Sequence, residues 1–368
     1  MKKLAIIGAS YLQLPLVEKA IEMGIETHCF AWADGAICKD VANYFYPVSV
    51  LDKESILQEC QKIGIDGITT IATDIAMPTI SYVAEHLGLT ANTQIAAINA
   101  TDKWRMREAF ARHGCSIPKY EVVDSASQTV MINFPVIVKP VDRSGSQGVT
   151  KVINANGLKP AVEKALLLSI SKKAIVEEYI DGDEVSVESI TWKGRHYILA
   201  ITDKVTTGSP NFVELAHHQP SNLLPAVKQR IIKEATDALT ALDIMYGAGH
   251  TEIKITPDGR PYVIEVGARM GGDFIGSHLV EISTGYDFLR GVINIALGHF
   301  EIPEINEEKY SGVYFLCKET EKLLPLFKKP QEFEHQKEML NADLKNATNS
   351  NDRSGYFIYT SVKREMLL

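Results

Sequence analysis

Two glutamates flank a strongly predicted turn and could together bind a metal ion. Glu252 and Glu265 lie in two apolar runs separated by the turn sequence Thr256 to Pro261. Proline and Asp-Gly in that turn fit a four-residue connection, which places the two glutamates opposite each other on one face, whereas a three-residue loop with a glycine bulge would separate them. Adjacent carboxylates repel by on the order of 1 kcal/mol unless a divalent cation binds both, and oxygen ligands suit Mg²⁺. The alternative is two carboxylates on opposite faces, paired with neighbours such as Lys254 or Arg269.

A lysine at the end of a buried strand suggests a phosphate site. Lys139 ends the apolar run that begins at Pro135, where a charge is costly unless an anion meets it. The loop that follows is rich in glycine and serine, and its backbone N–H groups can turn toward phosphate oxygens. The alternative is a solvent-exposed hairpin with a lysine at its edge. The loop residues concerned are Ser144, Gly145, Ser146 and Gly148.

An acidic linker follows the next apolar strand. Glu177-Glu178-Tyr179-Ile180 leads into a turn and then Glu184. A short linker of this kind can offer backbone groups to an adenine edge, while the Glu184 carboxylate takes ribose hydroxyls. By itself, the segment is explained better as a charged turn between strands.

Two further segments could contact a substrate. Arg269, in a run of small residues that includes Gly272, offers a planar fork matched to carboxylate or phosphate, although a structural arginine is the alternative. Glu214 and His217, in a polar segment after Lys204, could contact an ammonium group or transfer a proton. The alternative for this segment is a loop with solvated histidines, and metal ligation lacks further partners there.

The apolar pattern predicts an α/β region followed by a mixed α+β region. Residues 4–92 alternate short strands with helical stretches, a rhythm that predicts a parallel sheet. Beyond Pro303 short strands return, and the polar stretch 346–354 predicts a turn or mobile loop. The elements expected between these regions are a helix at 101–113, strands at 135–140 and 174–179, antiparallel strands within 183–202 and 248–266, and a helix at 225–243.

Composition and short sequence patterns disfavour several classes of protein. Among 368 residues, 45% are hydrophobic and 23% charged, with net charge −8 and no basic run, which disfavours nucleic acid or an anionic membrane as partner. Five widely spaced cysteines predict reduced thiols in a cytoplasmic protein, and the apolar run Leu4 to Ile7 is too short for a signal peptide or membrane span. Gly8-Ala9-Ser10-Tyr11 lacks the dinucleotide glycine pattern, so we interpret it as a structural turn.

Taken together and in this order, the segments resemble the ATP-grasp superfamily. Each motif alone is weak, so the resemblance depends on their conjunction over about residues 1–300, with a C-terminal segment of family type to 368. It implies an ATP-grasp fold with a parallel-sheet N-terminal domain. The implied limits are an N-terminal pre-ATP-grasp domain at 1–95, an ATP-grasp domain at 96–302 with its lid at about 115–182, and a small β-rich C-terminal segment at 303–368.

The resemblance also implies a role for each residue. The ATP phosphates would contact Lys103, Lys139 and the lid residues Ser144, Gly145, Ser146 and Gly148. The other nucleotide-binding residues would be Glu177, Glu178, Tyr179, Ile180 and Glu184, which contact adenine and ribose, and Lys204. Glu252 and Glu265 would bind Mg²⁺, or Mn²⁺ as a substitute. His250-Thr251-Glu252 and the Arg269-x-Gly-Gly run are similar to the L-amino-acid ligases, which make dipeptides. There Arg269 would bind the carboxylate or acyl-phosphate, and Glu214, His217 and Gly272 would line the substrate pocket.

The implied reaction is ADP-forming ligation of a carboxylate to an amine through an acyl-phosphate, with Arg269, Lys139 and His217 as catalytic residues. The carboxylate would be an amino acid or another small acid. One residue departs from the family pattern, because Gly267 stands where an asparagine ligand to the metal is usual. That substitution puts the two-metal arrangement in doubt. The oligomeric state is open, with a homodimer as the commonest outcome.

Three alternative functions remain at this point. A purine-pathway ligase or carboxylase would want an extra basic cluster near the first strand ends, and Gly8 to Gln13 offers none. A non-catalytic ATP-binding regulatory protein is supported only by Gly267. An NAD(P) oxidoreductase is disfavoured by the broken glycine pattern.

Overall fold

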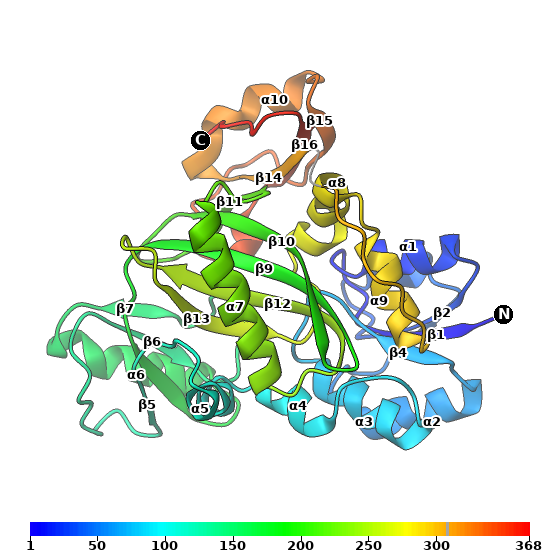
Figure 1. Cartoon of the computed structure of the whole chain (residues 1–368), viewed down its shortest axis with the longest axis horizontal. Coiled ribbons are helices and arrows are strands. Elements are labelled where there is room, and N and C mark those ends of the chain that lie inside the picture. Colours follow the sequence, from blue (N-terminus) through cyan, green and yellow to red (C-terminus); the bar gives the residue numbers. More distant parts are fainter. Residues whose placement is uncertain (307–308) are drawn as a thin grey trace.

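The first sheet is parallel and lies in the N-terminal part of the chain (Figure 1). In this computed structural model, which describes residues 1–306 and 309–368, its strand order is β3-β2-β1-β4. Its strands are β1 (Lys3–Ile7), β2 (Glu26–Phe30), β3 (Tyr44–Tyr46) and β4 (Gly67–Thr69), and its helices are α1 (Leu14–Glu22), α2 (Lys53–Ile63), α3 (Met77–Leu87) and α4 (Gln94–Asn99).

The apolar run of β1 is continuous because both faces of this sheet are covered. Ala5 and Ile7 pack in one core with residues of α2 and α3. Leu4 and Ile6 point to the other face and pack with residues of α1 and α9 (Phe288–Ala296). A strand buried on both faces has no solvent-exposed side, so polar residues do not alternate with apolar ones along it. The strand pairings are all parallel, which confirms the predicted parallel sheet.

A second, antiparallel sheet forms a separate layer with α6 on one face. Its strand order is β5-β8-β6-β7, and Val138, Val176 and Val162 share its core. Helix α5 (Lys103–His113) precedes it in the chain, with Asp102 as its N-cap and Gly114 in left-handed conformation after its last turn. The elements are β5 (Tyr120–Val123), β6 (Val136–Pro140), β7 (Thr150–Val152), β8 (Ala174–Glu178) and α6 (Leu158–Leu168).

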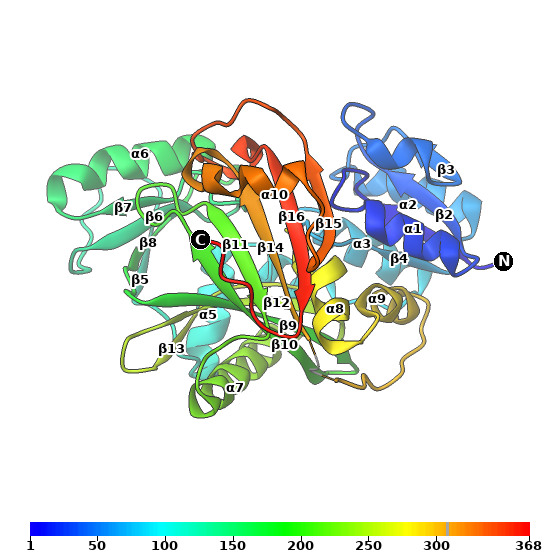
Figure 2. The same ribbon diagram turned by 90° about the horizontal axis from the view of Figure 1, so that it is seen from above.

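The third sheet has eight strands and runs through the middle of the molecule into the C-terminal part (Figures 1 and 2). Its order is β13-β12-β9-β10-β11-β14-β16-β15, with every pair antiparallel. Helix α7 (Pro225–Ala241) buries Ile231, Ala235 and Leu239 in the same core as Val185 and Val187 of β9. The strands are β9 (Asp183–Trp192), β10 (Arg195–Thr206), β11 (Glu214–Gln219), β12 (Tyr246–Ile255), β13 (Pro261–Gly267), β14 (Tyr310–Leu316), β15 (Glu334–Met339) and β16 (Gly355–Ser361).

The remaining helices are short or connect the sheets. Strand β11 pairs with β14, so the C-terminal strands extend the central sheet instead of forming a sheet of their own. No helix among the described residues is both long and apolar enough to cross a membrane. All five cysteines are free, as predicted, and all five are buried. These further elements are α7 (Pro225–Ala241), α8 (Val280–Thr284), α10 (Leu324–Lys328), a π-helix (Ile275–Leu279) and 3₁₀ helices at Ile37–Asp40, Ala155–Gly157, Lys318–Leu323 and Ser350–Asp352.

Candidate active site

A cavity of about 410 Å³ gathers almost all the residues that the sequence singled out. Its walls come from the loops after β1 and β4, the second sheet, the central sheet and the C-terminal segment. Gly148 is the predicted residue that lies outside the lining. This glycine has φ 78° and packs against Pro140 and Leu168, so it serves the turn of the loop. The lining includes Lys103, Lys139, Ser144, Gly145, Ser146, Glu177, Glu178, Tyr179, Ile180, Glu184, Lys204, Glu214, His217, Glu252, Glu265, Arg269 and Gly272.

The two candidate metal ligands do lie directly opposite each other across the β12–β13 hairpin. The route to that pairing differs from the predicted one. Thr256 N–H donates to the Arg260 carbonyl (3.0 Å) and the loop glycine has φ 77°, so the connection has three residues, not four. A second irregularity then makes Ile264 an extra residue in β13, and this shift brings Glu252 and Glu265 back into register.

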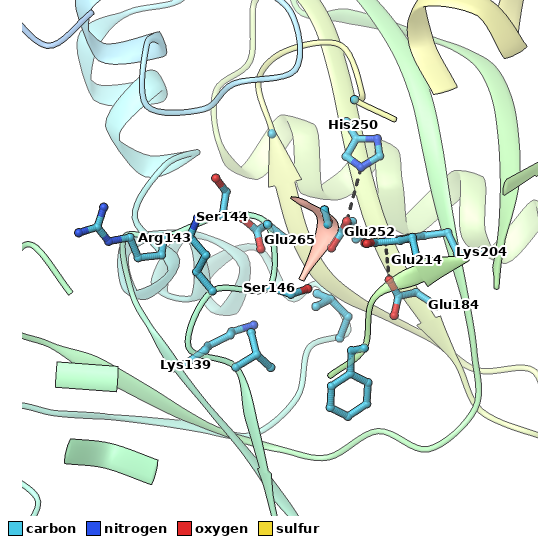
Figure 3. Close-up of a pocket in the computed structure, with 18 of the residues that line it drawn as sticks. Lys139, Arg143, Ser144, Ser146, Glu184, Lys204, Glu214, His250, Glu252 and Glu265 are labelled. Atoms are coloured by element: carbon cyan, nitrogen blue, oxygen red, sulfur yellow. Dashed lines mark hydrogen bonds and ion pairs between the residues drawn. The ribbon is translucent and has the colours of Figure 1, made fainter. Parts of the chain in front are cut away.

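Each of these glutamates is held by a lysine at the cavity wall. Figure 3 shows Glu252 beside Lys204. Lys103 Nζ lies 2.8 Å from Glu265 Oε1, and Lys204 Nζ lies 2.9 Å from Glu252 Oε1. Burial alone would raise the pKa of Glu252, but Lys204 and His250 hold it well below the usual value. An ionised carboxylate facing a second one across a hairpin is a donor set that suits Mg²⁺.

The protein offers only part of a coordination shell. Within residues 1–306 and 309–368, no group of three or more histidine, cysteine or acidic side chains is arranged to hold a metal. A cation held by Glu252 and Glu265 therefore takes its other oxygens from elsewhere, and phosphate oxygens of a nucleotide are suitable partners. Glu252 and Glu265 therefore suit a metal ion that binds together with a nucleotide.

Lys139 lies in a buried triad of charges. Glu177, 3% exposed, bridges Lys139 Nζ (2.7 Å) and the guanidinium of Arg107 (2.7 Å). Burial lowers the pKa of Lys139, and Glu177 opposes that shift. Since both Glu177 oxygens face cations, contacts with an adenine ring are left to neighbouring residues of the linker. Arg107 also donates to the carbonyl of Ile264 (2.6 Å), the extra residue of β13.

Lys204 binds three carboxylates from three strands. Its Nζ lies 2.6 Å from Glu184, 2.9 Å from Glu252 and 3.7 Å from Glu214, and its side chain is 4% exposed. Burial opposes the charge of this lysine, but Glu184 and Glu252 raise its pKa well above the usual value. Lys204 is thus a permanent cation that fixes the candidate ribose and metal carboxylates relative to each other.

A second buried pair lies behind Glu252. His250 Nδ1 bonds to Glu188, whose other oxygen accepts from the N–H of Gly271 (3.1 Å). Burial lowers the pKa of His250, but Glu188 outweighs it and raises that pKa to about 9, so the imidazole is charged at neutral pH. His250 Nε2 lies 3.6 Å from Glu252 and adds to the positive charge around it.

The polar segment that contains Glu214 and His217 is a strand, β11, and not a solvated loop. His217 is 1% exposed and lies 3.7 Å from Asp273, which makes a two-point ion pair with Arg353 (2.6 and 2.7 Å). Tyr11 also lines the cavity and is close enough to Asp273 and Arg353 to interact with both. The stretch 346–354 therefore brings a cation to the site.

Comparison with known proteins identifies the fold that carries this cavity. A family model described as an ATP-grasp domain matches residues 132–277. The crystal structure of an L-amino acid ligase from Bacillus licheniformis has a TM-score of 0.85 and 24% identity, covering 99% of this chain and 94% of that one. The chain has the ATP-grasp fold. N5-carboxyaminoimidazole synthetase from Staphylococcus aureus, solved with ADP, gives a TM-score of 0.79 at 16% identity, with coverage of 98% and 93%.

The chain is also similar in sequence to a ligase. Alanine--anticapsin ligase from Bacillus subtilis (strain 168) is 29% identical over 245 residues, which are 60% of this chain and 51% of that enzyme. The chain thus spans about half the length of this curated relative. The region matched by the ATP-grasp model runs from just before β6 into the π-helix. It includes Lys139, Glu252, Glu265 and Arg269.

The cavity also contains charged residues that sequence analysis missed. Asp74 pairs with Arg269 (2.8 Å), Glu188 with His250, and Arg107 with Glu177. Asp74 lies in the loop after β4, and the neighbouring Ala72 N–H donates to the carbonyl of Met270 (3.1 Å). The three missed residues, Asp74, Glu188 and Arg107, do not stand in a recognisable motif. The signal available for Asp74 was its place just after a parallel strand, where ligands of such sheets bind.

Proposed function

We propose that the chain is an ATP-dependent ligase that joins a carboxylate to an amine through an acyl-phosphate and releases ADP. The observation that carries this proposal is the meeting of Glu252 and Glu265 across one hairpin, in one cavity with Lys103 and Lys139. Paired carboxylates and lysines are what a triphosphate with its Mg²⁺ requires. The activities of the similar proteins, amino acid ligase and alanine--anticapsin ligase, support the same reaction type.

The nucleotide would occupy the cavity from the linker to the hairpin. Tyr179 and Ile180, with the backbone of Glu178, would contact adenine, and Glu184 would accept from the ribose hydroxyls. Lys103, Lys139 and the backbone of Ser144 to Ser146 would bind phosphate oxygens. Glu252 and Glu265 would hold Mg²⁺, or Mn²⁺ in its place, which neutralises charge on the phosphates when bound.

The chemistry then needs positioning rather than a covalent protein nucleophile. Arg269 would hold the substrate carboxylate, one oxygen of which attacks the γ-phosphorus in line while the bond to ADP breaks. The amine nitrogen next attacks the carbonyl carbon of the acyl-phosphate, phosphate leaves, and the nitrogen loses a proton. His217 or Glu214, which both line the cavity, would receive that proton. The loop from Ser144 to Ser146 would exclude water, which otherwise hydrolyses the intermediate.

The domain limits and assembly are part of the proposal. We place the N-terminal domain at 1–95, the ATP-grasp domain at 96–302 with its lid near 115–182, and the C-terminal segment at 303–368. The parallel sheet, the β5-β8-β6-β7 sheet and strands β14 to β16 fall within these limits and support them. A homodimer remains a prediction.

The test is ADP release across a matrix of amino acids, small carboxylates and amines. We expect release that requires a carboxylate, and a dipeptide or amide as product. Glu265→Gln should lower that rate on the order of 100-fold or more, because one carboxylate of the metal pair is lost. Asp258→Asn, an exposed position on the same hairpin, is the matched control and should leave the rate unchanged. Full turnover by the Glu265 variant would overturn the assignment of the site.

A further inference from the structure

Glu265 faces Glu252 only because β13 carries one extra residue. Near the turn, the hairpin pairs Ile253 with Val263. Continued without a break, that register would place Ile264 opposite Glu252 and move Glu265 to the other face of the sheet, because side chains alternate along a strand. The extra residue, Ile264, restores the pairing of the two glutamates. The contacts that hold this bulge therefore decide whether the two carboxylates meet.

Helix α5 supplies hydrogen bonds that hold the bulge. Strand β13 is an edge strand of the central sheet, and the bulge releases backbone groups from the ladder that need other partners when they are buried. Arg107 Nη2 donates to the carbonyl of Ile264 at 2.6 Å. The N–H of Val266 donates to Met106 Sδ at 3.4 Å. Two consecutive side chains of α5 thus satisfy backbone groups on the two sides of Glu265.

The same helix also holds the carboxylate that the bulge redirects. Lys103 lies one turn before Arg107 on α5, so the two side chains project from the same face of the helix. Lys103 Nζ lies 2.8 Å from Glu265 Oε1, and both Lys103 and Arg107 are buried. One face of α5 therefore fixes the side chain of Glu265 as well as the backbone beside it.

Arg107 also links the bulge to the candidate phosphate site. Its side chain is fully buried, and its Nη2 lies 2.7 Å from Glu177 Oε1. The other oxygen of Glu177 lies 2.7 Å from Lys139 Nζ. A planar guanidinium bonds to its partners in fixed directions. Arg107 therefore sets β13 of the central sheet against β8 of the second sheet, and these two sheets carry the candidate metal and phosphate residues.

We propose that Arg107 is a positioning residue of the active site, which holds the Ile264 bulge and so directs Glu265 toward Glu252 and the metal between them. This inference rests on the proposed ligase function and deepens it, since Arg107 lies outside the cavity lining and touches neither nucleotide nor substrate. Loss of its guanidinium should lower the affinity for the divalent cation, because Glu265 is then free to turn away from Glu252.

The experiment measures Mn²⁺ binding by electron paramagnetic resonance in the presence of a non-hydrolysable ATP analogue. Arg107→Met removes the donor to Ile264 but leaves Glu177 paired with Lys139, so no buried charge loses its only partner. We expect Mn²⁺ to bind at least tenfold more weakly. Arg107→Lys keeps the charge and N–H donors, and should recover the affinity to within threefold of the unmodified protein. Arg105→Met, at an exposed position of the same helix, is the matched control and should leave it unchanged.

A second control separates positioning from loss of stability. Ile56 is fully buried in α2 and lies outside the cavity lining. Ile56→Ala should therefore lower the melting temperature without changing the affinity for Mn²⁺. Unchanged Mn²⁺ affinity in Arg107→Met, or an equal loss in Ile56→Ala, would overturn the proposal while the ligase function stands.

A crystal structure of the unmodified protein with Mn²⁺ and the ATP analogue tests the proposal without any variant. Arg107 should still donate to the carbonyl of Ile264 while Glu265 binds the cation. A cation held by both glutamates with that hydrogen bond broken would overturn the positioning role alone. Absence of Mn²⁺ binding by the unmodified protein would defeat both this role and the proposed function.

Discussion

At the scale of single residues, the site depends on buried charges that neutralise one another. Glu177 lies between Lys139 and Arg107, and Lys204 lies among three carboxylates. Such groups are costly to bury alone and are stable only as sets. Removing one member therefore acts on folding as well as on ligand binding, and experiments at this scale must measure both.

Glu177→Gln should destabilise the protein by about 3–5 kcal/mol, because it leaves two buried cations without their counter-ion. The measurement is the free energy of unfolding in urea. Glu163→Gln, on an exposed position of α6, is the control and should change stability by less than about 0.5 kcal/mol. A loss within the control range would show that Lys139 and Arg107 are solvated in solution.

Much of the site could be predicted from local sequence, but its ion pairs could not. Glu252 and Glu265 flank a readable turn, and their pairing was predicted correctly although the turn length was wrong. The compensating extra residue, Ile264, has no signature in its own segment, and the hydrogen bond its carbonyl accepts comes from Arg107 of α5, far away in the sequence. Asp74 pairs with Arg269, which is 195 residues away in the sequence, and neither segment carries a pattern that predicts this contact.

At the scale of elements, β11 explains a wrong expectation about the histidines. Its residues are polar and were interpreted as a possible loop, yet His217 and His218 are both 1% exposed. A central strand between β10 and β14 faces the cavity on one side and the C-terminal core on the other. Polar residues are tolerated here because His218 bonds to Tyr359 (2.9 Å) and His217 faces the cavity. The period-2 pattern of a half-buried strand is therefore missing.

Acid should destabilise the protein through His218. Burial lowers its pKa to about 3 in the folded state, against about 6.5 unfolded. The unfolded chain thus takes up a proton first, and this contribution to stability, present at neutral pH, falls by about 2 kcal/mol between pH 7 and pH 5. Urea unfolding at both pH values should show a smaller fall in His218→Gln than in the unmodified protein. His86→Gln, on an exposed helix position, should retain the full dependence; an identical dependence in all three proteins would contradict the assignment.

The C-terminal segment should be needed for a stable site, because Arg353 holds Asp273. Arg353→Met leaves the Asp273 carboxylate without its two-point partner, and we expect a loss of about 3 kcal/mol in unfolding free energy. The double variant with Asp273→Asn should recover part of that loss, and the double-mutant cycle measures the coupling. Lys363→Met, an exposed cation in the same segment, is the control. No coupling in the cycle would show that the pair contributes nothing to stability.

At the scale of the whole molecule, the fold brings four separate parts of the chain to one cavity. The order of strands and helices was predictable because apolar periodicity is local. The continuity of the central sheet through β11 and β14 was not, since it joins residues about a hundred positions apart. As a result, the C-terminal segment contributes to the site instead of standing apart from it.

Nucleotide should stabilise the protein only together with the cation. At a ligand concentration of 100 times Kd, binding to the native state adds about 2.7 kcal/mol to its stability. Thermal unfolding should shift upward with ATP and Mg²⁺ and much less with ATP and a chelator. Glu252→Gln should lose the Mg²⁺-dependent part of the shift, whereas Asp258→Asn should keep it. Equal shifts with and without Mg²⁺ would show that nucleotide binding does not depend on a cation held by the glutamate pair, which would contradict this prediction.

The most direct test of the account is a crystal structure with Mg²⁺ and a non-hydrolysable ATP analogue. We predict a cation bound by Glu252 and Glu265 and by oxygens of the β- and γ-phosphates, with Lys103 and Lys139 turned to the phosphates. A triphosphate bound elsewhere, or one bound here with both glutamates still paired to lysines and no cation between them, would contradict the central claim.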